Sequence, residues 1–136
     1  MKQVIICSSF RKRLKGLRRH FSENDVVSDV RRFTTTGFGK GECELKQEII
    51  GETEISILKL RIRVQSSVGR YLLGVVNSEH YIPIFIDLKT GRYGKNMSFA
   101  ASREVVSMLE RAFEETLLDY LEHTEEDPRF TKYALV

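Results

Sequence analysis

The sequence predicts an α+β fold in which an N-terminal strand and a helical hairpin pack on an antiparallel β-sheet meander, with a long C-terminal helix. Three apolar segments lie between residues 54 and 88 and are separated by short turns, as in a meander. Two segments with apolar residues at helical spacing precede the meander, and a longer one follows it. The length of 136 residues fits a single domain with its own core.

The N-terminal part is expected to form one strand and two helices. Residues 3–8 are a short apolar run typical of a buried strand, and the serines at its end can cap the helix that follows. A glycine at position 16 can kink this helix. The second helix is expected to begin after Ser22 and to end at Gly37. The apolar stripe of the first helix consists of Phe10, Leu14, Leu17 and Phe21.

The central part is expected to form the sheet, and the last long helix follows it. Residues 37–54 contain four glycines and predict a turn that leads into a strand. Pro83 lacks a backbone donor and is therefore expected at a sheet edge or at an unpaired position. The last helix is expected to begin at Ser98 or Ser102 and to reach about His123. The meander strands are expected at 54–64, 70–76 and 80–88, with turns at 65–69 and 77–79.

Charge is distributed unevenly along the chain. Residues 1–40 contain 10 Lys/Arg and 3 Asp/Glu, a balance of +7, and residues 41–95 contain 8 and 7, a balance of +1. Residues 96–136 contain 4 and 9, a balance of −5. This asymmetry favours a polyanionic partner for the basic part. Residues 1–123 are expected to form the domain, and residues 124–136 an acidic tail that is flexible or docks on it.

Several kinds of protein are disfavoured by the sequence. It contains neither an apolar run of about 20 residues that could cross a bilayer nor a signal-peptide core, so we expect a cytoplasmic protein with no membrane partner. Cys7 and Cys43 lack a metal-ligand spacing and the three histidines are scattered, so we expect neither a metal nor another cofactor. The glycines around Lys40 lack the spacing of a phosphate-binding P-loop.

The strand at 54–64 carries a row of three cations, Lys59, Arg61 and Arg63, which alternate with apolar residues. Same-face residues of a strand lie about 6.6 Å apart, close to the spacing of successive phosphates in a nucleic-acid strand. Neighbouring like charges destabilise a sheet, so the row indicates an anionic partner. Further basic and tyrosine side chains follow at Arg70, Tyr71, Tyr81, Lys89, Arg92, Tyr93 and Lys95.

Cations and tyrosines without a metal suit the cleavage of RNA. The 2′-hydroxyl supplies the nucleophile, clustered cations stabilise the charge on the phosphorane oxygens, and a lysine or tyrosine moves protons. The sequence offers no Ser-His-Asp or Cys-His arrangement and no evident carboxylate pair. Asp87 is the one acid among these basic positions, and we expect it to have a salt-bridge or surface role.

The order of elements and three motifs resemble the RelE/ParE superfamily of bacterial toxins. The motifs are the cationic strand, the Ser-Ser-x-Gly-Arg-Tyr turn at 66–71 and the Lys-Thr-Gly-Arg-Tyr-Gly-Lys loop at 89–95. The resemblance is densest over residues 55–113. It implies the toxin of a type II toxin–antitoxin pair, neutralised by a cognate antitoxin protein. In the RelE branch, it further implies an endoribonuclease that cleaves mRNA on the ribosome without a metal.

The resemblance also implies roles for individual residues. Catalytic roles in proton transfer and phosphate binding fall to Lys59, Arg61, Arg70, Arg92 and Tyr93. RNA-binding roles are expected for Arg63, Tyr71, Lys89 and Lys95. The chain departs from the family in two ways. Leu72 stands where the family often has an arginine, and the final helix and tail are longer and acidic.

Two other functions remain open on the sequence. Leu72 favours a ParE-like gyrase inhibitor, or a catalytically inert member that acts by binding a protein. The basic helix at 9–21 favours a general nucleic-acid-binding module unrelated to toxins, for which binding should weaken strongly with salt.

Overall fold

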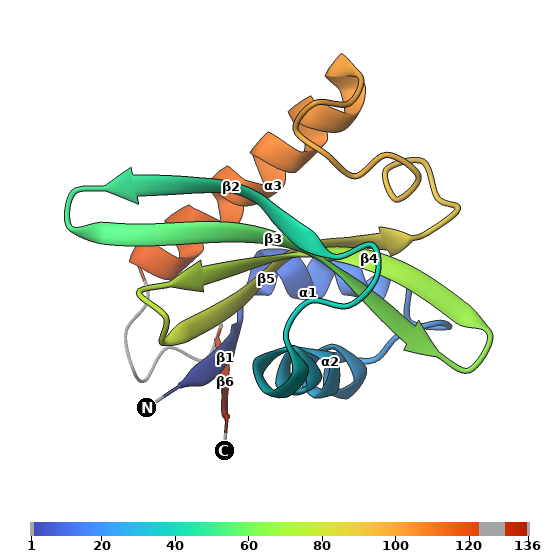
Figure 1. Cartoon of the computed structure of the whole chain (residues 1–136), viewed down its shortest axis with the longest axis horizontal. Coiled ribbons are helices and arrows are strands. Elements are labelled where there is room, and N and C mark those ends of the chain that lie inside the picture. Colours follow the sequence, from blue (N-terminus) through green and yellow to red (C-terminus); the bar gives the residue numbers. More distant parts are fainter. Residues whose placement is uncertain (1, 123–129, 136) are drawn as a thin grey trace.

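The structure, a computed structural model, describes residues 2–122 and 130–135. Its elements are β1 (Gln3–Ile6), α1 (Ser8–Lys15), α2 (Glu23–Thr36), β2 (Cys43–Ile50), β3 (Thr53–Val64), β4 (Ser67–Val76), β5 (His80–Leu88), α3 (Arg103–Leu121) and β6 (Thr131–Ala134). The strands form one sheet in the order β2-β3-β4-β5-β1-β6, antiparallel except for the β1–β5 pair (Figure 1). The α+β prediction is confirmed. Within the described residues, no helix is long and apolar enough to span a membrane.

The sheet separates two apolar clusters, and α2 and α3 lie on opposite sides of it (Figure 1). Alternation along β3 explains the separation, because Leu60 and Ile62 pack in the cluster with α2, whereas Ile57 packs in the cluster with α3. Complete burial of each such side chain contributes about 1.5–3 kcal/mol. The cations of β3 share the face of Ile57, so the α3 side of the sheet carries the candidate site.

The helical hairpin differs from the prediction in its first half. The expected helix through Phe21 is wrong, because α1 ends at Lys15 and Gly16 forms its C-terminal cap. Phe21 nevertheless lies in the core, since residues 16–20 form turns that keep it against the sheet. The N-cap of α2 was predicted correctly. Ser22 Oγ accepts from the N–H of Asp25, and the Asp25 carboxylate accepts from the N–H of Ser22.

The meander has the predicted strands with one shorter turn. β4 begins at Ser67, three residues earlier than expected, and Gln65 takes a positive φ of 55° in the two-residue turn before it. β5 is a central strand between β4 and β1. Pro83 pairs with Leu73 on this central strand, next to a register shift between Leu72 and Leu73, so the prediction of a sheet edge or an unpaired position is wrong. The expected strand within residues 37–54 is β2, an edge strand.

Part of the predicted tail belongs to the sheet. β6 pairs antiparallel with β1 along four residues, and Phe130 just before it is only 9% exposed. Residues 130–135 therefore dock on the domain, which is one of the two alternatives expected for the tail. α3 begins after Ser102, one of the two serines predicted as its N-cap. The predicted helix end near His123 and residues 124–129 of the predicted tail lie outside the described residues.

Candidate nucleic-acid interface

The cationic row lies beside a fourth cation on the next strand. Arg70 of β4 is the direct cross-strand partner of Arg61, and Asp87 of β5 is the partner of Arg70. Among the described residues, none of Lys59, Arg61 and Arg63 has an ion-pair partner. Arg61 and Arg70 repel each other, and neither forms an ion pair within the described residues, so this face of the sheet favours an anion.

Two opposed residues hold the loop after β5 in place. Arg70 Nη1 donates to the carbonyl oxygens of Gly94 at 2.8 Å and Lys95 at 3.0 Å. The Asp87 carboxylate accepts from the N–H groups of Leu88 at 2.8 Å, Tyr93 at 2.9 Å and Gly94 at 3.2 Å. The loop is therefore fixed from both sides, and Asp87 accepts hydrogen bonds from the loop instead of having the salt-bridge or surface role expected from the sequence.

The loop and the start of α3 enclose a groove with the sheet. Three cations from separate elements line it, Lys59 from β3, Arg70 from β4 and Lys95 from the loop. Ser102, the N-cap of α3, also lines the groove, whose volume is about 350 Å³. A helix N-terminus carries a partial positive charge, and no carboxylate is among the lining residues. The groove is therefore suited to a phosphate-sized anion.

The remaining predicted residues lie outside this groove. Arg61 and Arg63 continue the row along β3, and Lys89 is exposed at the start of the loop. Arg92 is ion-paired with Glu104 of α3 and lies 5.9 Å from the ring centroid of Tyr93. The Tyr93 ring is half-buried and packs edge-on against Phe85 at 5.7 Å. Neither Arg92 nor Tyr93 lines the groove.

The expectation that Tyr71 binds RNA is wrong in this structure. Tyr71 is fully buried on the α2 side of the sheet, because it follows Arg70 and successive side chains of a strand point to opposite faces. Its hydroxyl donates to Asp29 Oδ2 at 2.5 Å. Burial raises the pKa of Tyr71 well above its usual range, and the neighbouring Asp29 adds to the increase. Tyr71 is thus a core residue with one buried hydrogen bond.

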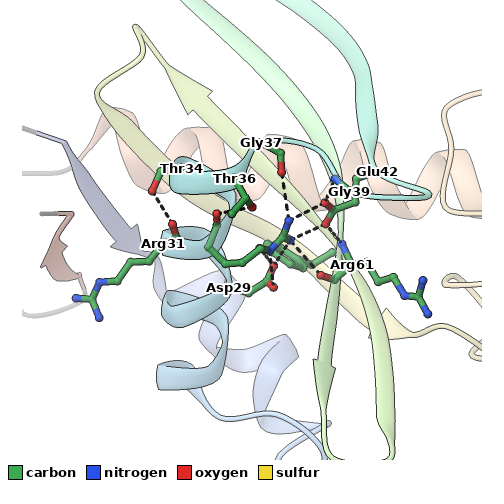
Figure 2. A network of polar contacts seen from close by, with 10 residues as sticks. Asp29, Arg31, Thr34, Thr36, Gly37, Gly39, Glu42 and Arg61 are labelled. Atoms are coloured by element: carbon green, nitrogen blue, oxygen red, sulfur yellow. Dashed lines mark hydrogen bonds and ion pairs between the residues drawn. The ribbon is translucent and has the colours of Figure 1, made fainter.

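A polar network that the sequence did not predict lies between α2 and β3 (Figure 2). The hydroxyl of Tyr71 joins it through the hydrogen bond to Asp29. Arg32 of α2 is ion-paired with Asp29 at 3.0 Å and with Glu42, before β2, at 2.7 Å. Glu42 also accepts from the backbone N–H of Arg61 at 2.7 Å. The Arg61 side chain points away from this network (Figure 2). The network therefore holds the backbone at Arg61, whereas the Arg61 side chain extends away from the network.

The network shifts the pKa of each of its charged groups. Burial raises the pKa of Asp29, although hydrogen bonds from Arg32 and Tyr71 oppose the increase. Burial would also raise the pKa of Glu42, but hydrogen bonds from Arg32 and from the N–H groups of Arg61 and Gly39 lower it overall. The hydrogen bond with Glu42 raises the pKa of Arg32. The network has only a weak signal in the sequence, because Asp29 and Arg32 resemble any i, i+3 ion pair of a helix.

Leu72 has a structural reason to be apolar. It pairs with Lys59 on one side and Phe85 on the other, and it is fully buried in the cluster under α3. An arginine at this position would place a charge in the core at a large energetic cost. The packing at this position therefore excludes an arginine.

Comparison of the chain with protein-family models, with curated proteins and with solved structures found no match.

Proposed function

We propose that this protein is a RelE-like toxin, a metal-independent endoribonuclease that cleaves mRNA on the ribosome. One observation carries the proposal, the convergence of Lys59, Arg70 and Lys95 on a groove at the N-terminus of α3 that no carboxylate lines. Its partners would be mRNA, the ribosome and a cognate antitoxin protein in the cytoplasm. The order of strand, helical hairpin, meander and helix supports the proposal.

The groove residues suggest how the reaction would proceed. The scissile phosphate would lie between Arg70 and Lys95, whose charges stabilise the oxygens of the phosphorane. Lys59 in its neutral form would accept the proton of the 2′-hydroxyl as O2′ bonds to phosphorus. The P–O5′ bond then breaks and Lys59 returns the proton to O5′, which leaves a 2′,3′-cyclic phosphate and a 5′-hydroxyl.

The flanking residues would position the substrate. Arg61 lies one same-face step from Lys59, about 6.6 Å along the strand, where it can bind the adjacent phosphate. Arg63 extends the track by a further step. Arg92 would have to leave Glu104 to reach RNA, so we assign it and Tyr93 an accessory role.

The test is cleavage of end-labelled mRNA in a translating extract. A chelator of divalent ions is absent during translation and is added only in a subsequent chase. Lys59→Ala and Arg61→Ala should lower the cleavage rate by about 10²-fold or more. Arg111→Ala is the matched control, since Arg111 is an exposed cation of α3 outside the groove, and it should cleave normally. Wild-type protein that leaves mRNA intact would refute the proposal.

A non-enzymatic member of the same superfamily is the second candidate, acting as a gyrase inhibitor or by protein binding alone. It is favoured by the arrangement of Arg70 and Tyr93, because the Arg70 guanidinium already donates to two carbonyls and the Tyr93 ring packs on Phe85. Mapping of mRNA 5′ ends after brief expression separates the two. Codon-phased new ends support the nuclease, whereas DNA damage without such ends supports the inhibitor.

A further inference from the structure

A second group of cations surrounds the turn between α1 and α2, away from the groove. Lys12, Lys15, Arg18 and Arg19 are exposed and line an open depression of about 490 Å³. We call these four residues the α1–α2 turn surface. The other residues that line the depression are Gly16, Leu17 and His20, so no carboxylate contributes to it.

The α1–α2 turn surface differs from the other cations of the two helices in having no internal partner. Arg11 pairs with Glu23 at 2.8 Å, and Arg13 pairs with Glu115 at 2.8 Å. Within the described residues, no ion pair involves Lys12, Lys15, Arg18 or Arg19. Four neighbouring cations without counter-ions produce a positive potential that attracts a polyanion.

The turn that carries this surface is anchored directly behind the groove. His20 Nδ1 is hydrogen-bonded to Ser67 Oγ at 2.8 Å, and the Phe21 ring lies over Gly69, where a Cβ atom would come within 2.8 Å of it. Gly69 immediately precedes Arg70, which lines the groove on the other face. The two basic surfaces therefore lie back to back at one end of β4.

Exposed cations also lie at the end of the sheet that separates the two surfaces. Arg63 is exposed and pairs in register with Val68, near the β3–β4 turn. Lys89 is exposed, and its backbone N–H donates to the carbonyl oxygen of Val68 at 2.9 Å. Arg63 and Lys89 thus place exposed cations near the β3–β4 turn, at the end of the hairpin where the groove and the α1–α2 turn surface lie on opposite faces.

We propose that an RNA longer than the groove binds both surfaces, its backbone passing Arg63 and Lys89 to reach the α1–α2 turn surface. The inference rests on the proposed function, because it assumes that RNA is the ligand of the groove. A flexible polyphosphate chain can follow cations around the end of a sheet. A planar anionic bilayer cannot meet both faces at once, so the arrangement favours RNA over a membrane.

The test compares binding of short and long RNA, about 5 and about 20 nucleotides, with 2′-O-methyl groups that block cleavage. In the double variant Arg18→Glu/Arg19→Glu, affinity for the long RNA should fall at least about tenfold. The slope of log K against log salt should fall by about 1.4, the share of two phosphates of a single strand. Binding of the short RNA should stay within about twofold of wild type, because the groove is intact.

The matched control is Arg31→Glu/Lys132→Glu. It changes the net charge by the same amount as the test variant, but its substitutions lie on α2 and β6. It should retain long-RNA affinity. Equal loss in both double variants would mean that only net charge matters, and unchanged long-RNA binding in Arg18→Glu/Arg19→Glu would mean that the surface is not used. Either result overturns the inference, as would binding to anionic vesicles but not to RNA. Cleavage is blocked in the modified RNA, so the binding assay does not depend on nuclease activity. A protein that binds the long RNA through both surfaces but leaves unmodified RNA intact refutes the nuclease proposal alone.

Discussion

Arg70 and Asp87 are direct cross-strand partners of opposite charge, yet both are hydrogen-bonded to the same loop. The arginine donates to the carbonyls of Gly94 and Lys95, and the aspartate accepts from the amides of Leu88, Tyr93 and Gly94. Together they satisfy backbone groups that would otherwise need water. This arrangement places Lys95 at the groove and connects the strands of the sheet to the candidate site.

Asp87→Ala should loosen this loop. Three N–H groups lose their acceptor, so we expect the free energy of unfolding to fall by about 1–3 kcal/mol. Amide hydrogen exchange at Tyr93 and Gly94 should accelerate far more than exchange within β3. Protection at these two amides that matches wild type would show that Asp87 does not hold the loop.

Gly94→Ala should disrupt the groove more severely than other glycine substitutions. A Cβ atom at Gly94 would lie 1.8 Å from the carbonyl oxygen of Leu88, so the loop must move. At Gly16, the nearest atom would be 3.4 Å away and the backbone is already helical, so Gly16→Ala should be neutral or stabilising by about 0.4–1 kcal/mol. Thermal unfolding and binding of short RNA should both separate the two variants. Equal effects would contradict the loop geometry.

The buried network should give stability an acid-sensitive component through Glu42. Its folded pKa is lowered, so its contribution is present above the unfolded pKa of about 4.3 and is lost as pH falls through the folded pKa. Asp29 acts in the opposite direction because its folded pKa is raised, and stability that it provides when protonated is lost as pH rises through that pKa.

Glu42→Gln should therefore flatten the acid limb of the stability curve. Urea unfolding from pH 3 to 7 should show a smaller decrease towards low pH in the variant than in wild type. Asp29→Asn should have the reverse effect and make the acid-side decrease steeper. Parallel curves for wild type and Glu42→Gln would show that the ion pair with Arg32 does not couple to folding.

The two cysteines should differ sharply in reactivity. Burial raises the pKa of Cys7 to about 12, whereas Cys43 is exposed on the edge strand β2. A thiol reagent at pH 7.5 should modify Cys43 quickly and leave Cys7 intact until denaturant is added. Mass spectrometry of the labelled peptides gives the result, and Cys43→Ser provides the control with only the buried thiol. Rapid labelling of Cys7 in the folded protein would be inconsistent with the packing of β1.

Local patterns in the sequence determined most of the secondary structure. The alternation of Leu60 and Ile62 with Arg61 and Arg63 fixed β3 and its cationic face, because strand side chains alternate whatever their neighbours are. Ser22 and Asp25 likewise fixed the start of α2 through a local capping box. The prediction that the first helix continues past Gly16 was wrong. Phe21 is buried even though the backbone turns after Lys15, so the apolar stripe did not distinguish a continued helix from a turn.

Only the tertiary structure decided which cations meet. Lys59, Arg70 and Lys95 come from two strands and a loop, and their convergence depends on strand register and on hydrogen bonds to Asp87 that have no periodic signature. The same holds for the pairing of β6 with β1, which joins the two ends of the chain. The row on β3 thus followed from the sequence alone, whereas the groove and the pairing of β6 with β1 required long-range packing.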